Sequence, residues 1–146
     1  MALELRVIDQ RVGGGEDAAL TLTGLAERTT LRDLIRTRVR EEVARYNAGP
    51  TERFNGLVRP VGAEEGINGY RLARPRRLDW EEQARVAEEA FMRNGFFVLV
   101  GNRQVDDLDE ELELNADTEI RFLRLTPLVG GWSWLCCGVR RRRRRV

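Results

Sequence analysis

The fold is decided by residues 96–131, which read FFVLVGNRQVDDLDEELELNADTEIRFLRLTPLVGG. Phe96–Val100 is a short apolar run of aromatic and β-branched residues, which predicts a strand buried on both faces. A turn at Gly101-Asn102 and a resumed strand at Arg103–Val105 follow it. Glu119–Leu125 then alternates well enough to be a second long strand. Before that strand, residues 115–117 (Asn-Ala-Asp) favour a tight turn.

The strand at 119–125 is followed by a segment that cannot continue in the centre of a sheet. Pro127 has no backbone N–H to donate, so Thr126 to Gly131 is expected to leave the sheet as a free arm. Gly130 and Gly131 carry no Cβ, so the tip can thread a channel too narrow for side chains. Such a tip can bring its backbone carbonyl close to a nucleotide phosphate.

The segment VLVGNRQVDDLDEELELNADTEIRFLRLTPLVGG resembles the closing half of ubiquitin-like sulfur carriers, such as the small subunit of molybdopterin synthase and the thiamine sulfur carrier. Leu123-Arg124-Leu125, followed by the diglycine, also resembles the arm of ubiquitin. The resemblance implies a β-grasp fold and a terminal glycine carboxylate that a partner enzyme adenylates for sulfur transfer or protein conjugation. On this resemblance Gly131 is the reacting glycine, Gly130 gives clearance, and the arm residues that guide it along the partner are Leu123, Leu125, Leu128 and Val129.

The same resemblance implies the partners. An E1-like activating enzyme would supply ATP, Mg²⁺ and the reactive cysteine, while the chain itself would bind no cofactor and would not be an enzyme. Two alternatives stay open. One is a β-grasp interaction module that holds a partner without activation. The other is an enzyme with Cys136 or Cys137 as nucleophile, which is disfavoured because no histidine is present to lower a thiol pKa.

The first half of the chain has the pattern of an α+β domain. Leu3, Leu5 and Val7 alternate with polar residues, as do Leu20 and Leu22, so two strands joined by a hairpin at Gly13–Gly15 are expected. A helix capped by Thr30 follows, with an apolar stripe that faces the sheet, and it stops at residues 47–50 (Asn-Ala-Gly-Pro). The stripe consists of Leu31, Leu34, Ile35, Val39, Val43 and Tyr46.

The fold class is therefore predicted as α+β: a mixed β-grasp sheet with one packed helix in a single domain over residues 1–131. Residues 48–95 depart from the compact pattern of the carrier family and are expected to be an insertion of loops and a second helix. The dipeptides Asn55-Gly56 and Asn68-Gly69 predict turns or a small hairpin. Asp79 is expected to cap the second helix with Glu82 in the reciprocal position, and Asn94-Gly95 to end it. Its expected stripe is Trp80, Ala84, Ala87 and Phe91.

Charge excludes some functions. Six of the 25 basic residues lie at 140–145, so residues 1–139 hold 19 basic against 24 acidic residues, a net charge of −5. Such a body is not expected to bind nucleic acid. All basic residues are arginine, and histidine, the usual general base, is absent.

No apolar run reaches the roughly 20 residues of a membrane span and the N-terminus lacks a signal core, so a cytoplasmic location is expected.

Two charged runs are expected to be solvent-exposed rather than binding sites. The arginines at 71, 74, 76 and 77 could meet a phosphate, but a solvated loop is favoured. The acidic run lacks the glycine and the ligand spacing of a calcium loop, so no metal site is predicted and a solvated loop or a face for a basic partner is favoured. Its members are Asp106, Asp107, Asp109, Glu110, Glu111 and Glu113.

Residues 132–146, WSWLCCGVRRRRRRV, differ in composition from everything before them. Activation at Gly131 needs a free carboxylate, so a processing protease would first have to cut after this glycine. The tail is expected to be disordered or removable. A contact of its tryptophans and arginines with an anionic membrane surface or nucleic acid is the remaining alternative.

Overall fold

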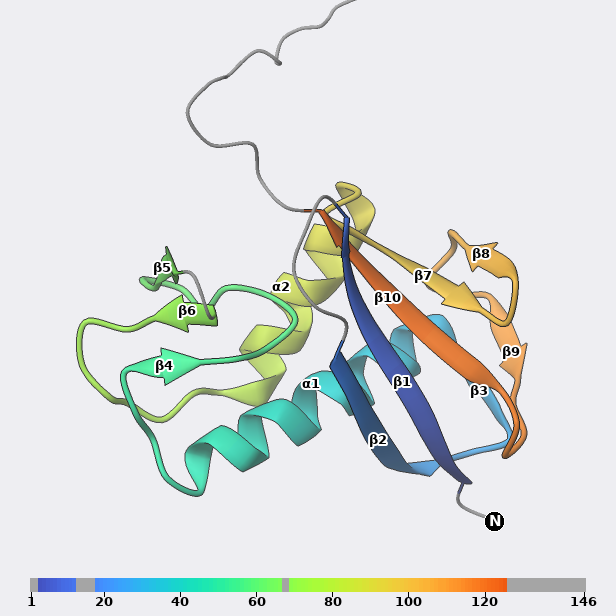
Figure 1. The fold of residues 1–146 in the computed structure, drawn as a ribbon, viewed down its shortest axis with the longest axis horizontal. Coiled ribbons are helices and arrows are strands. Elements are labelled where there is room, and N and C mark those ends of the chain that lie inside the picture. Colours follow the sequence, from blue (N-terminus) through green and yellow to red (C-terminus); the bar gives the residue numbers. More distant parts are fainter. Residues whose placement is uncertain (1–2, 13–17, 67–68, 126–146) are drawn as a thin grey trace, which may run out of the picture.

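The computed structural model describes residues 3–12, 18–66 and 69–125, which form an α+β fold with a mixed sheet and two helices (Figure 1). The expected glycine hairpin at 13–15, the arm at 126–131 and the tail lie outside these residues. The main sheet has the order β2-β1-β10-β7-β8. β1 runs parallel to β10, and the other neighbours are antiparallel. Its strands are β1 (Leu3–Val12), β2 (Ala18–Leu25), β7 (Phe96–Val100), β8 (Arg103–Val105) and β10 (Glu119–Leu125).

All five strands of this sheet were expected, three from apolar alternation, β7 from its continuous apolar run and β8 as the strand resumed after a turn, and the prediction is confirmed. The expectation that Phe96–Val100 is buried on both faces is wrong. Phe96 and Val98 are buried, whereas Phe97 and Leu99 are half-buried. The reason is that side chains alternate between faces and the helices cover only one of them. We call the face that carries Phe96 and Val98 the covered face of the sheet, and the face that carries Phe97 and Leu99 the open face.

Helix α1 (Leu31–Asn47) begins and ends where the sequence indicates. The Thr30 hydroxyl accepts a hydrogen bond from the Asp33 backbone N–H at 3.1 Å, which satisfies one free donor of the first turn. At the other end, the Asn47 side chain bonds both the N–H and the carbonyl of Leu78. The expected stripe is buried except for Tyr46, which packs partly buried against the core. Arg38 lies buried within the same stripe, which the apolar pattern did not predict.

Helix α2 (Trp80–Met92) follows its predicted bounds, with a corrected cap. The Asp79 carboxylate accepts from the N–H of Glu81 at 3.1 Å, and within the described chain Glu82 makes no return bond to Asp79. The helix ends as expected, because Asn94 adopts a left-handed φ of 62° and the Gly95 N–H donates back to the Ala90 carbonyl at 2.8 Å.

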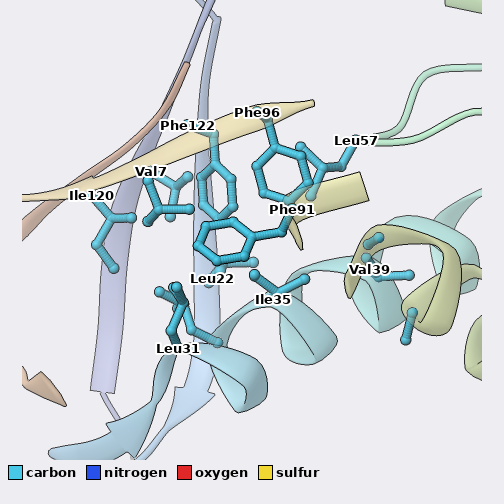
Figure 2. Packing of buried hydrophobic residues seen from close by; sticks show 14 of the residues in the cluster. Val7, Leu22, Leu31, Ile35, Val39, Leu57, Phe91, Phe96, Ile120 and Phe122 are labelled. Carbon is cyan, nitrogen blue, oxygen red and sulfur yellow. The ribbon is translucent and has the colours of Figure 1, made fainter. Parts of the chain in front are cut away.

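The second helix, which was expected within the 48–95 insertion of the single domain, is part of the central core. Phe91 of α2 packs on Phe96 with ring centroids 5.7 Å apart, and Phe96 packs on Phe122 at 6.0 Å. Figure 2 shows this aromatic group against Ile35 of α1 and Val7 of β1. Residues 48–95 therefore contribute to the same apolar cluster as the sheet and α1.

The rest of residues 48–95 forms a small sheet with the order β4-β6-β5. The expected hairpin is its β5–β6 pair, while β4 was not predicted. Gly69 is required here, because it has a φ of 117° and an added Cβ would lie 2.1 Å from the Asn55 Oδ1 atom. The strands are β4 (Arg53–Phe54), β5 (Glu64–Gly66) and β6 (Gly69–Arg71).

The acidic run is more ordered than the expected loop. Its last residues form β9 (Glu111–Glu113), which pairs with β3 (Arg28–Thr30), the residues that lead into α1. The leucines within and beside the run are buried and anchor it to the core, which a periodicity based on the acids alone does not reveal. These leucines are Leu108, Leu112 and Leu114.

Candidate functional site

The predicted arm begins at the carboxyl end of β10. Leu123 lies half-buried on the open face of the sheet, with Phe97 and Gln10 as its neighbours on the adjacent strands. Leu125 is the last residue of β10 and pairs with Val12. β10 is the central strand of its sheet, so the chain passes from the middle of the fold into the segment at 126–131. The other predicted arm residues, Leu128, Val129, Gly130 and Gly131, lie outside the described residues.

The open face carries an apolar surface beside this end of β10. Register places Leu123 next to Phe97 and Arg121 next to Leu99. On the other side, Ile8 lies next to Arg121. All these side chains are half-buried, and neither helix covers them. A face of this kind can hold a partner protein through apolar contacts with a polar rim.

The covered face is apolar at one end of β1 and β10 and charged at the other. We define its apolar end as Leu5, Val7 and Ile120, which are all fully buried. The next positions on the same face are Asp9 and Phe122, which are partners in register, and then Arg11 and Arg124. We define the charged end as Asp9, Arg11 and Arg124.

A buried ion network occupies the boundary between the two ends. The Arg38 guanidinium is 1% exposed and contacts both Asp9 carboxylate oxygens at 2.5 Å and Glu42 at 3.0 Å. Burial alone lowers the pKa of Arg38, but the charges of Glu42 and Asp9 outweigh it and the pKa is raised. The guanidinium also lies over the Phe122 ring, 4.5 Å from its centroid. Glu42 in turn accepts from the Leu57 N–H, so the network joins β1, α1 and the 48–95 segment.

Beyond this network the covered face opens into a cleft of about 890 Å³ between the sheet, the end of α1 and the small sheet. Arg124 donates Nη1 to the Gly56 carbonyl at 2.8 Å, which fixes its side chain at the cleft wall. Asp9 and Glu42 also line the cleft, but both are engaged by Arg38. The basic residues that line it are Arg11, Arg45, Arg53 and Arg124.

The charges of these arginines also affect the ionisation of Tyr70 in β6. Burial raises the pKa of its hydroxyl above the ordinary value, and this is the largest effect. The charge of Arg124 lowers the pKa; with smaller contributions, Glu65 raises it and Arg11 lowers it. The phenol is therefore neutral at physiological pH and can donate a hydrogen bond. The influence of both Arg11 and Arg124 on one hydroxyl indicates that their charges act on a common region.

No family model, curated protein or solved structure matches the chain. Within the described residues, neither helix is long and apolar enough to cross a membrane.

The arginines at 71, 74, 76 and 77 are exposed as expected, and Arg76 bonds the Val61 carbonyl. None of the described residues forms a group of three or more acidic, cysteine or histidine side chains able to hold a metal ion.

The acidic run is partly neutralised by arginines of the same chain. Arg32 contacts Asp109 at 3.1 Å, Arg28 contacts Glu113 at 3.0 Å, and Arg103 contacts Glu110 at 2.6 Å. These pairs are mostly exposed and each contributes little stability.

The charged end of the covered face was not predicted from the sequence. The signal for it is the break in the alternation of β1, where Leu5 and Val7 are followed on the same face by Asp9 and Arg11.

Proposed function

We propose that the chain is a ubiquitin-like carrier protein. In this proposal an E1-like partner adenylates the carboxylate of Gly131 for sulfur transfer or conjugation, after a protease has removed residues 132–146. The chain is then a cosubstrate, and ATP and Mg²⁺ belong to the partner. The carboxylate attacks the α-phosphate of ATP, pyrophosphate leaves, and the acyl-adenylate is open to attack by sulfur or an amine.

The observation that carries the proposal is the position of β10. It is the central strand, lies parallel to the first strand, and leads directly into the sequence Thr-Pro-Leu-Val-Gly-Gly. The order β2-β1-β10-β7-β8, with α1 after the first two strands, is also the order expected of a β-grasp fold and supports that assignment. A rigid central strand gives the arm a fixed starting point, which a partner needs in order to align its tip.

The open face gives the partner a surface to recognise. Phe97, Leu99 and Leu123 lie on it next to the start of the arm, so one partner could hold the body and the arm together. The same surface supports a second candidate, a β-grasp interaction module that binds a partner without any reaction at Gly131. The two functions differ only in what happens to the carboxylate.

The experiment that tests the proposal is trapping of an activated carboxylate. A chain ending at Gly131 is incubated with ATP, Mg²⁺ and hydroxylamine in an extract of the native host, and its C-terminal peptide is examined by mass spectrometry. We expect an ATP-dependent hydroxamate at Gly131. The matched control, Gly130→Ala in the same truncated chain, should react much less because its methyl group obstructs a narrow channel.

An unmodified carboxylate in the presence of ATP, under conditions in which the extract activates its own carrier proteins, would contradict the carrier function. A Leu99→Asp variant of the truncated chain extends the test. If the open face holds the activating partner, this variant should lose hydroxamate formation while the free energy of unfolding falls by only about 1 kcal/mol, since residue 99 is half-buried and not part of the core.

A further inference from the structure

The cleft at the charged end has a charge opposite to that of the body around it. Residues 1–139 carry a net charge of −5, yet four arginines line the cleft. Within the part of the chain that the structure describes, the acids in its wall are Asp9 and Glu42, and both are already engaged by the buried Arg38. Among the described residues, neither Arg53 nor Arg124 forms an ion pair. The cleft is therefore a local positive site in an acidic protein.

Two of these arginines are held close together by the backbone. Arg11 and Arg124 are partners in the parallel ladder of β1 and β10 and lie on the same face. Like charges on neighbouring strands repel each other, and an anion between them removes that repulsion. Arg124 also has unused donors, because Nη1 bonds Gly56 while its buried Nε has no hydrogen-bond partner among the described residues.

The other side of the cleft offers an aromatic surface. Tyr46 of α1 is half-buried, and its ring is fixed by an edge-on contact with the buried Phe54 at 5.4 Å between centroids. Its hydroxyl donates to the Thr51 carbonyl at 2.8 Å, which holds the ring in place. A preformed hollow with a few charged groups and an aromatic wall is typical of a small-molecule site, for which volumes of about 300–1,000 Å³ are usual.

We propose that this cleft binds a small phosphate ester, with Arg11, Arg53 and Arg124 holding the phosphate and Tyr46 packing against the rest of the molecule. Guanidinium groups match phosphate oxygens in geometry and charge. The site differs from the proposed reaction at Gly131 in its residues, and neither depends on the other.

Titration of the full chain with AMP at low ionic strength tests this site, with the backbone amides followed by NMR. We expect saturable shifts at Asn55, Gly56 and Gly69, which line the cleft. Arg53→Gln should raise the dissociation constant about tenfold, because one charge-assisted hydrogen bond is lost. Arg53 is exposed, so the variant should remain folded. The matched control is Arg85→Gln, which removes the same charge from an exposed position of α2 outside the cleft.

Two further ligands separate the parts of the site. Adenosine, without the phosphate, should not bind measurably, and inorganic phosphate should bind more weakly than AMP because it leaves Tyr46 uncovered. No saturable binding of AMP, or equal weakening in the two arginine variants, would overturn the proposal. Adenosine binding as tightly as AMP would overturn the phosphate contact. If inorganic phosphate bound as tightly as AMP, the assignment to a phosphate ester would be overturned, and the cleft would be a site for the free anion.

Discussion

The apolar end and the charged end of the covered face are built on the same two strands with the same alternation. At the apolar end Leu5, Val7 and Ile120 are fully buried. At the charged end the equivalent positions hold Asp9, Arg11 and Arg124, and a cleft replaces close packing. The difference teaches that backbone pairing places the side chains, whereas the residue type at each position decides whether the surface stabilises the fold or is available for binding.

The largest expected effect concerns the boundary residue Phe122. Phe122→Ala should lower the free energy of unfolding by about 4 kcal/mol, because it opens a cavity beside Phe96 and removes the ring that lies under Arg38. Denaturation with urea measures the loss. The control is Phe97→Ala on the open face, where the ring is half-buried and the loss should be about 1 kcal/mol. Equal losses would mean that the two faces are equally packed, which would refute the division into a covered and an open face.

Asp9→Ala is expected to have the next largest effect. It leaves Arg38 buried with Glu42 as its remaining carboxylate partner, and removal of one member of a buried ion pair costs about 3 kcal/mol. The matched control is Asp106→Ala, an exposed position for which the change should stay within about 0.5 kcal/mol. Thermal or urea unfolding of both variants gives the comparison. If Asp9→Ala were as harmless as the control, the network would not be part of the folded core.

Arg11→Gln should have the smallest effect on stability. Because Arg11 lies next to Arg124, its loss removes a repulsion, and the free energy of unfolding should stay the same or rise by up to about 0.5 kcal/mol. The control is Arg28→Gln, which breaks the exposed pair with Glu113 and should lower stability by up to about 0.5 kcal/mol. The decisive result is that Arg28→Gln lowers the free energy of unfolding whereas Arg11→Gln does not. A loss in Arg11→Gln as large as that in Asp9→Ala would assign Arg11 to the packing of the fold.

The long elements could be predicted from the sequence because each has its own local signal. The cap at Thr30, the stripe of α1 and the end of α2 at Asn94-Gly95 depend on neighbouring residues only. The short strands β3, β4 and β9 were missed, since two or three residues show no periodicity and their pairing partners are distant in the chain. Placement of α2 in the core likewise depends on Phe91 meeting Phe96 and on the contact between the two helices.

The candidate site was predictable only in part. The strand that carries Leu123 and Leu125 follows from alternation, while the arm beyond it remains a prediction that lies outside the described residues. The burial of Arg38 could not be expected, because an arginine in an apolar stripe is normally exposed and its partner Asp9 comes from another element. The meeting of Arg11 and Arg124 depends on the register of two strands from opposite ends of the chain, which no local pattern encodes.

The intact mass of the protein isolated from its native host tests the carrier function most directly. The account predicts a population that ends at Gly131, as a free carboxylate, a thiocarboxylate or a conjugate. Treatment with an alkylating reagent would distinguish the thiocarboxylate, because a sulfur at that position reacts and an oxygen does not. A population that retains residues 132–146 throughout, with no modification at Gly131, would contradict the carrier function and leave the interaction module.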